Sequence, residues 1–308
     1  MLAVWLGMIL PGIGLNLLVL EQRQDRLRQL PVEKPQVQQT EEPFILVSDQ
    51  DGRAGSMDPE TYLTGVLLAE MPSEFHREAL KAQSVAARTY VWKAFTTGGK
   101  HGDNSVCMDS ACCQAYMTSE DYLARGGTLE NLEKLRKAVE DTVGMVLAYD
   151  GELIEATYFS SAGGSTESAV AVWGADYPYL QAVNSPEPIR TETVSYARDI
   201  FFRLLGIPEP REDESMIGSV AYTEGGGVAT MEICGHAFTG TQLRAILGLS
   251  STALEISTVV DMVRITTRGY GHRVGLSQYG ANALAESGYT WQEILQHYYP
   301  GTTLYPAY

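Results

Sequence analysis

Positive charge is scarce in this sequence. Its 308 residues contain 22 Lys and Arg against 38 Asp and Glu, which gives a formal net charge of -16 at pH 7. No basic stripe is available to neutralise phosphates, so the composition argues against nucleic acid as a partner. It also offers no basic patch for anionic lipid. The 44% hydrophobic fraction is typical of a globular protein, and the length suits one large domain or two modest ones.

Cysteine is scarce as well, since four residues are too few for a disulfide framework. Three of them lie close together, at Cys107, Cys112 and Cys113, which indicates a local site. His101, Cys107 and Cys113 follow one another at intervals of six positions (107-101=6, 113-107=6). Two thiolates and an imidazole supply three ligands of a tetrahedral zinc site. On spacing alone, a disulfide from Cys107 to either neighbour is an equal alternative.

The N-terminal segment lacks charge altogether. As a helix, residues 2–20 would extend about 28 Å, close to the thickness of a bilayer core. They have neither the charged start nor the small-residue cleavage site of a signal peptide, which favours a transmembrane anchor over residues 1–20. Arg23, Arg26 and Arg28 on the C-terminal flank favour the opposite orientation under the positive-inside rule. Residues 21–42, rich in Gln, Glu and Pro, are predicted to be a linker.

From residue 43 to 308, helical and β-rich stretches alternate without an internal repeat, which predicts an α+β fold. Asp58 and Pro59 suit the start of a helix that ends by Pro72. Ser73 is expected to cap the next helix, which continues to the pair of glycines at 98 and 99. The Asp150-Gly151 pair between two β-rich runs predicts a hairpin. Residues 185–260 are predicted to be an inserted, smaller α/β module.

Glu70 ends the first helix on its apolar side. Leu63, Val66, Leu67 and Glu70 fall on one face of the helix. A carboxylate there is either paired or has a raised pKa, and a protonated carboxyl near neutral pH suits a general acid. The alternative is a helix-end glutamate that simply reaches solvent. Arg88, on the next helix, reaches this site if the two helices pack as a hairpin, and otherwise is a surface arginine.

A glycine-rich stretch, "GYGHRVGLSQYG", surrounds His272, Ser277, Gln278 and Tyr279 with four glycines. Glycines allow close approach of a backbone, and polar side chains on such a turn suit a binding groove. His272 and Ser277 do not make a catalytic triad, because no positioned acid accompanies them. A buried structural histidine is an equal alternative.

Seven stretches in a fixed order are similar to the stage II sporulation protein D family, within the wider group of amidase-enhancer domains. They are "YLTGVLLAEMPSEF", "EALKAQSVAARTY", "CQAY", "SSAGGST", "YPYLQAV", "TGTQLRAILGLSST" and "GHRVGLSQYGA", and the resemblance covers roughly residues 43–305. Arg273 stands where glycine is usual in the family, and Leu276 where methionine is common.

The resemblance implies a membrane-anchored lytic transglycosylase with its catalytic domain outside the cytoplasm. Its substrate would be peptidoglycan glycan strands that lack stem peptides, cleaved to 1,6-anhydro-muramic acid ends during sporulation engulfment. An amidase and a membrane scaffold protein would be its partners. Two rival interpretations are a non-catalytic activator of a peptidoglycan amidase and a zinc hydrolase that cuts the peptide stem.

The resemblance also assigns residues. Glu70 would be the catalytic acid, and a structural zinc ion would be held by His101, Cys107 and Cys113. The "CQAY" motif selects Cys113 over Cys112, and a fourth ligand stays open. The residues expected to line the glycan groove are Arg88, Ser160, Ser161, His272, Gln278 and Tyr279.

Overall fold

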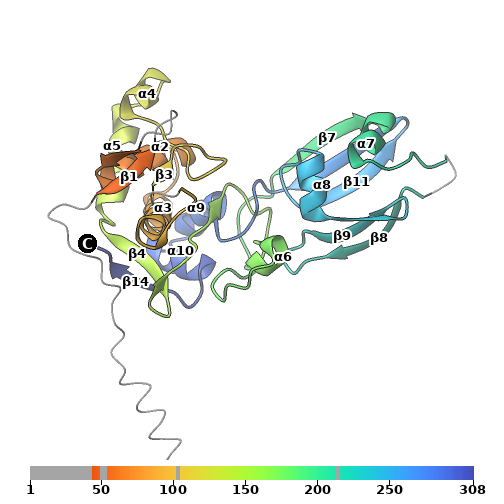
Figure 1. The fold of residues 1–308 in the computed structure, drawn as a ribbon. Helices are drawn as coiled ribbons and strands as arrows, with labels where there is room; N and C mark the ends of the chain where they lie inside the picture. The colour runs from red at the N-terminus through yellow and green to blue at the C-terminus, as the bar shows by residue number, and fades with distance from the viewer. Residues whose placement is uncertain (1–43, 49–53, 102–104, 212–214) are drawn as a thin grey trace, which may run out of the picture. The chain divides into compact units, whose positions relative to one another are not determined.

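The computed structural model describes residues 44–48, 54–101, 105–211 and 215–308. The predicted anchor over residues 1–20 and the predicted linker over residues 21–42 lie outside these ranges. Within them, none of the helices combines the length and the apolar character needed to cross a bilayer. The described residues belong to one compact unit, Val37–Tyr308, which Figure 1 shows in colour from residue 44 onward.

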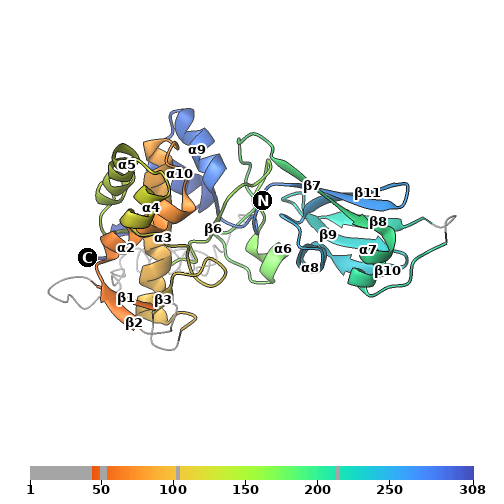
Figure 2. The same cartoon turned by 90° about the horizontal axis from the view of Figure 1, so that it is seen from above.

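Helix α3 (Arg77–Thr97) is the central element of a helical core. It contacts α2 (Pro59–Glu70), α5 (Leu129–Glu140), α9 (Gln278–Glu286) and α10 (Trp291–Tyr298), as Figure 2 shows. Small side chains make this close packing possible, because the alanines on the buried face of α3 leave room for four neighbours. They are Ala79, Ala82, Ala86 and Ala87, each fully buried.

The start of α3 differs from the prediction. His76 is the N-cap, and its Nδ1 accepts a hydrogen bond from the Glu78 backbone N–H. The expected Ser73 cap is wrong, because Ser73 faces α5, where its carbonyl accepts from Lys134 Nζ at 2.9 Å and its hydroxyl from Asn131 at 3.1 Å. The short helix α4 (Ser119–Ala124) precedes α5.

Small sheets surround these helices. Strand β1 (Ile45–Ser48) pairs antiparallel with β2 (Ala54–Met57) and parallel with β3 (Val106–Cys107). Strand β4 (Met145–Tyr149) lies between β5 (Glu152–Leu153) and β14 (Thr303–Pro306). The hairpin at Asp150 and Gly151 is confirmed. Both residues have positive φ, 49° and 85°, which a tight two-residue turn requires.

A two-stranded parallel ribbon carries two of the sequence motifs. Strand β6 (Tyr158–Phe159), which leads into "SSAGGST", pairs with β13 (Leu276–Ser277) of the glycine-rich stretch. Helix α6 (Ala169–Trp173) follows the "SSAGGST" loop. The ribbon therefore brings together segments that lie more than a hundred residues apart in the chain.

The inserted module has its own hydrophobic core, which includes Phe201, Ile233, Val263 and Ile265. One of its sheets has the order β11-β12-β7 and the other β10-β9-β8. The module's elements are β7 (Thr191–Ala197), α7 (Arg198–Leu205), β8 (Ile217–Tyr222), β9 (Val228–Ile233), β10 (His236–Thr239), α8 (Gly240–Ile246), β11 (Ala253–Val259) and β12 (Met262–Arg268). Because β12 pairs with both β7 and β11, the module extends past the predicted limit at residue 260. Helices and several small sheets together confirm the α+β prediction.

A buried ion pair fixes the glycine-rich stretch to the module. The guanidinium of Arg273 lies 3.2 Å from Glu167 Oε1, and it also donates to the Gly225 carbonyl at 2.7 Å. Glu167 accepts in turn from the Gly227 N–H and the Thr223 hydroxyl, both at 2.8 Å. Arg273 thus supplies a side chain that ties two loops to the β8–β9 turn.

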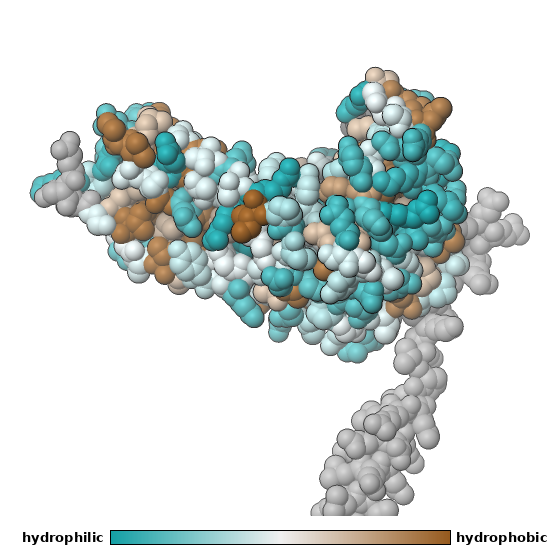
Figure 3. All heavy atoms as spheres, turned by 180° about the vertical axis from the view of Figure 1, so that it is seen from behind, coloured by the Kyte–Doolittle hydropathy of each residue, from teal (hydrophilic) through white to brown (hydrophobic). Residues whose placement is uncertain are grey.

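The face of the molecule in Figure 3 is mainly hydrophilic, with apolar residues in small separate groups. Exposed large apolar side chains of the described residues include Val260, Tyr222 and Met262 of the module. Scattered apolar residues of this kind are normal on soluble surfaces.

Candidate active site and metal centre

Glu70 is the last residue of α2, and the helix forms as its sequence predicts. Asp58 caps it by accepting from the Thr61 N–H at 2.8 Å, and Pro59 occupies the first turn. The apolar stripe is buried, which leaves Glu70 half-buried at the end of the same face. There its Oε1 accepts a hydrogen bond from the Ala115 backbone N–H at 2.9 Å.

Two opposing influences act on the Glu70 carboxyl. Burial raises its pKa above the ordinary value, while the Ala115 N–H and the side chain of Gln278 lower it, and burial dominates. This direction agrees with the prediction made from the apolar stripe. Burial favours the protonated acid, and the two donors favour the carboxylate. The site therefore accommodates both forms that a group acting first as an acid and then as a base must adopt.

Two uncharged phenols lie near Glu70. The hydroxyls of Tyr62 and Tyr158 are buried, and that of Tyr62 has no hydrogen-bond partner among the described residues. Burial raises the pKa of each far above its ordinary value, and the nearby Glu70 charge adds to that rise. Sequence reasoning missed both. Tyr62 lies two turns before Glu70 on the same helix face, so the spacing contained the signal for it.

One histidine and three cysteines form a compact cluster beside this site. Their ligand atoms all lie within 4.8 Å of one another, and the four residues are His101, Cys107, Cys112 and Cys113. His101 follows α3, and Cys107 ends β3. The other two lie in a turn in which the N–H groups of Cys112 and Cys113 both bond the Asp109 carbonyl.

The separations in the cluster fit a tetrahedral zinc site. The His101 Nε2 atom lies 3.7 Å from Cys112 Sγ and 3.5 Å from Cys113 Sγ, and the two sulfurs are 4.0 Å apart. Ligands placed tetrahedrally around zinc would be about 3.5 Å apart for sulfur and nitrogen and about 3.8 Å for two sulfurs. A disulfide requires about 2 Å between sulfurs, so Cys112 and Cys113 are not bonded to each other.

Cys112 therefore joins His101, Cys107 and Cys113 as a fourth donor, where the resemblance selected Cys113 over Cys112. Burial works against ionisation of Cys107, but hydrogen bonds from the Asp109 backbone, the other two cysteines and His101 lower its pKa to about 7. The hydrogen bond with Cys107, and then burial, raise the pKa of Cys112 to about 11. A divalent cation would ionise all three thiols. Four protein donors leave no open position, which argues against a zinc ion that activates water.

The cluster and Glu70 share one loop. Cys113 is two residues before Ala115, the residue whose N–H holds the Glu70 carboxyl. Fixing the cysteine turn therefore fixes a hydrogen-bond donor of the candidate acid.

Arg88, in contrast, does not lie at Glu70. Its guanidinium is fully buried and binds Glu60 through two hydrogen bonds of 2.9 and 2.6 Å. It also donates to the carbonyls of Val139 and Met145, both at 3.2 Å. Glu60 is ten residues before Glu70, about 15 Å along the helix. This arrangement indicates a structural role in joining α2 and α5, rather than a place in the groove.

Ser161 is also engaged elsewhere. The buried carboxylate of Glu187 accepts from the Ser161 hydroxyl and the Ala162 N–H, both at 2.6 Å, and from the hydroxyls of Ser185 and Ser277. Glu187 is a residue that sequence reasoning missed, because "NSPEP" carries no pattern of its own. It holds "SSAGGST" against the glycine-rich stretch, so Ser161 and Ser277 support the loops from within.

Two of the other predicted residues, Ser160 and His272, line separate cavities. Ser160 lines one of about 250 Å³, together with Arg190, which lies 4.0 Å above the Tyr279 ring. His272 lines another of about 340 Å³ together with Arg244. Gly269 and Tyr270 belong to the first cavity, so the two cavities flank the segment 269–272.

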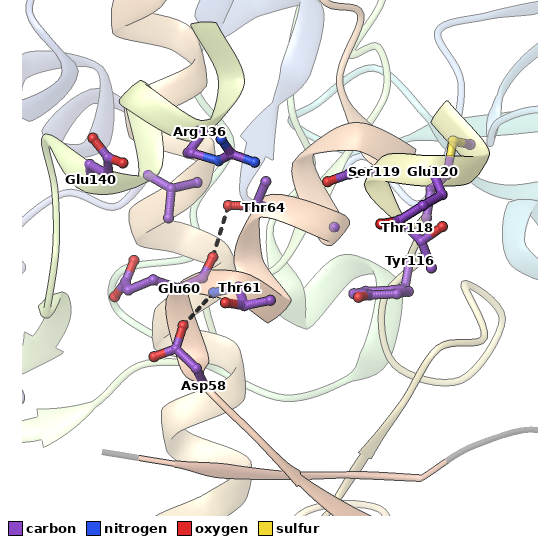
Figure 4. A pocket seen from close by; sticks show the side chains of 13 residues that line it. Asp58, Glu60, Thr61, Thr64, Tyr116, Thr118, Ser119, Glu120, Arg136 and Glu140 are labelled. Carbon is purple, nitrogen blue, oxygen red and sulfur yellow. Dashed lines mark hydrogen bonds between the residues drawn. The ribbon is translucent and has the colours of Figure 1, made fainter. Parts of the chain in front are cut away.

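A larger cavity of about 440 Å³ lies elsewhere, between α2, α4 and α5 (Figure 4). The carboxylates of Asp58 and Glu60 lie in it beside Thr61 and Thr64. Asp58 caps α2 and Glu60 pairs with Arg88, so these acids already have structural partners. Glu70 does not line this cavity, and size alone therefore does not identify the reactive site.

Comparisons with known proteins find stage II sporulation proteins and an amidase enhancer among the relatives of this chain. A family model described as "Stage II sporulation protein" matches residues 50–149. The chain is 37% identical over 257 residues to "Stage II sporulation protein D" of Bacillus subtilis (strain 168), covering 80% of this chain and 74% of the relative. It is 33% identical over 300 residues to "Amidase enhancer" of the same organism, covering 79% of this chain and 40% of the relative.

Proposed function

The chain belongs to the stage II sporulation protein D family, and we propose that it is a peptidoglycan lytic transglycosylase in which Glu70 is the acid and the base. Its substrate is the glycan strand after the stem peptides have been removed. Cleavage occurs between muramic acid and glucosamine and leaves a 1,6-anhydro-muramic acid end.

The environment of Glu70 carries the proposal. Burial raises the pKa of its carboxyl, two donors accompany it, and no other carboxylate of the described residues contributes to that shift. Glycosidases that use water need a pair of carboxyl groups, one on each side of the bond. A single carboxyl suffices when the sugar supplies the nucleophile from its own 6-hydroxyl.

The reaction then proceeds in two proton transfers through one side chain. Protonated Glu70 gives its proton to the glycosidic oxygen, the bond from that oxygen to C1 breaks, and the glucosamine leaves with the proton. The Glu70 carboxylate next takes the proton of the muramic acid 6-hydroxyl, while the oxygen of that hydroxyl forms a bond to C1. Glu70 ends protonated, as it began, and no water is consumed.

The neighbours of Glu70 have separate tasks in this scheme. The Ala115 N–H and the Gln278 side chain stabilise the carboxylate between the two transfers. Tyr62 and Tyr158 stay uncharged and close the apolar side of the carboxyl.

We propose further that His101, Cys107, Cys112 and Cys113 hold one zinc ion. The four donors and their separations support this assignment. Bound zinc would supply a rigid support for the loop that ends at Ala115, and it would not take part in bond cleavage. This role is distinct from the zinc-hydrolase interpretation, which needs an open coordination position.

The proposal includes a place in the cell. Residues 1–20 anchor the chain in the membrane, the domain from residue 43 onward lies outside the cytoplasm, and the chain acts in sporulation engulfment beside an amidase and a membrane scaffold protein. Fractionation of sporulating cells tests the first part. Release of the chain by salt, without detergent, would contradict an anchor.

The test of the reaction is the effect of Glu70→Gln on amidase-treated sacculi. Glutamine preserves the shape and removes the proton, and we expect the rate to fall about 10²- to 10⁴-fold. Glu74→Gln, an exposed glutamate four residues later, is the matched control and keeps full activity. The products are identified by mass.

One observation favours a second function, that of a non-catalytic activator of an amidase: the similarity to "Amidase enhancer". The two are separated by the same variant. An activator with Glu70→Gln would still stimulate a purified amidase, and the wild-type chain alone would yield no anhydro ends.

A further inference from the structure

The cavity beside His272 has the features of a binding site for an acidic sugar. It has a volume of about 340 Å³ and lies between helix α8, the segment after it, and the loops that carry α6 and His272. Its lining includes Val172, Thr241, Arg244, Leu249, Thr252 and His272.

Arg244 is the only charged side chain that lines this cavity, and the described residues leave it without a partner. Its Nε is buried and makes no hydrogen bond to any described residue. No described carboxylate lies within 4.0 Å of its guanidinium, the limit for an ion pair. Buried polar groups are nearly always satisfied, so an unpaired donor in a cavity indicates a missing acceptor. Arginine favours planar carboxylate or phosphate partners.

The wall next to Arg244 is aromatic and uncharged. Burial, and then the charge of Arg244, lower the pKa of His272 to about 4, so the ring is neutral at physiological pH. Its Nδ1 accepts from the Val274 N–H at 3.1 Å, which fixes the ring. The ring of Trp173, 45% exposed, lies 5.2 Å from it between centroids. A flat apolar surface beside a single cation suits a sugar ring that carries an anion.

The cavity adjoins the strand that faces Glu70. The His272 ring lies 5.5 Å from that of Phe159 in β6, and the preceding residue of that strand, Tyr158, is close enough to Glu70 for the carboxylate charge to raise its pKa. Strand β6 thus lies beside this cavity at Phe159 and near the candidate acid at Tyr158. A ligand long enough to occupy both places must be an oligomer, as a glycan strand is.

We propose that Arg244 binds the carboxylate of the lactyl group on a muramic acid, in a strand from which the stem peptide has been removed. This inference rests on the proposed function. The peptide is attached to that carboxyl through an amide, which is neutral, and its hydrolytic removal leaves a carboxylate at the same position. A cation at this subsite therefore discriminates stripped strands from intact ones by charge. The net charge of the chain is -16, so its overall field repels an anionic glycan. Attraction of the carboxylate therefore depends on the local positive charge of Arg244.

The test compares the binding of two glycans to the full chain carrying Glu70→Gln, so that neither is cleaved. One is a peptide-free muramic acid–glucosamine oligosaccharide with free lactyl carboxylates. The other is a chitooligosaccharide of equal length, which has no lactyl group. Calorimetry gives the dissociation constants. Adding Arg244→Gln should weaken binding of the muramic acid glycan about 10- to 100-fold, because a charge-assisted hydrogen bond is lost. Binding of the chitooligosaccharide should weaken less than about twofold.

Arg264→Gln is the matched control, because Arg264 is exposed on β12 of the same module and lines none of the three cavities. It should change neither constant, and Arg244→Lys should recover part of the binding. If Arg244→Gln weakens the binding of both glycans equally, Arg244 has a packing role and the proposal is overturned. Unchanged binding of the muramic acid glycan would also overturn it. If inorganic phosphate binds at Arg244 while the muramic acid glycan binds independently of it, the subsite serves another anion and the assignment fails.

The reaction is scored separately, by anhydro ends made by the chain with Glu70 intact. Absence of those ends with an Arg244-dependent preference for the carboxylate would refute the transglycosylase and keep the subsite. Anhydro ends together with glycan binding that does not depend on Arg244 would refute the subsite alone.

Discussion

Replacing Arg88 with methionine should destabilise the protein without removing its chemistry. The change leaves the Glu60 carboxylate without its cation and takes one donor away from each of the carbonyls of Val139 and Met145. Removing one partner of a buried pair costs about 3–5 kcal/mol. The Glu60 side chain is 19% exposed and water can reach it, so we expect the lower end, about 3 kcal/mol.

Urea unfolding measures this loss. With a denaturant slope of about 3 kcal/mol per molar, the midpoint falls by about 1 M. Adding Glu60→Gln removes the stranded charge, and the double variant should recover a large part of the loss, as coupled neighbours do. Arg136→Met on α5 is the control, since that side chain is 46% exposed and Glu133 is its one ion-pair partner among the described residues, so the midpoint should hardly change.

The alternative is that Arg88 contacts substrate. It predicts an unchanged urea midpoint with a fall of 10²-fold or more in turnover per folded molecule. That pair of results would refute the structural account of this residue.

Three further predictions concern the site itself. Gln278→Met removes a donor that lowers the pKa of Glu70, so the alkaline limb of the pH–rate profile should move to higher pH, while exposed Gln292→Met leaves it in place. Burial raises the pKa of Glu70 on folding, so the stability tied to this group is fully present below its unfolded pKa and is lost as pH rises through the folded pKa. Glu70→Gln should therefore be more stable than wild type in urea at pH 8 and equal to it at pH 4, and equal midpoints at both would contradict the burial argument. Elemental analysis should give about one zinc per wild-type chain, and Cys112→Ser should lower both this content and the thermal midpoint, whereas Cys234→Ser should change neither.

Patterns within one element predicted structure well. The Asp58 cap, the following proline and the apolar stripe were sufficient to place α2 and to put Glu70 at its buried end, because helix periodicity assigns residues to a face. The Asp150-Gly151 turn was equally local. The failed Ser73 cap was a local inference too, but Ser73 is held by α5, a contact that no local pattern contains.

Contacts between distant segments explain what could not be predicted. The two groups that hold Glu70 are 45 and 208 positions away, at Ala115 and Gln278 (115-70=45, 278-70=208). The pairing of Arg88 with Glu60 depends on how α2 and α3 cross. The "CQAY" motif selects Cys113 over Cys112, whereas the turn at the Asp109 carbonyl brings the sulfurs of both residues to one side.

Mass analysis of the glycan ends released from amidase-treated sacculi tests the central claim most directly. The account predicts that the wild-type domain from residue 43 to 308 releases strands with 1,6-anhydro-muramic acid ends, and that Glu70→Gln releases almost none. Strands with ordinary reducing ends, or full release by Glu70→Gln, would contradict it.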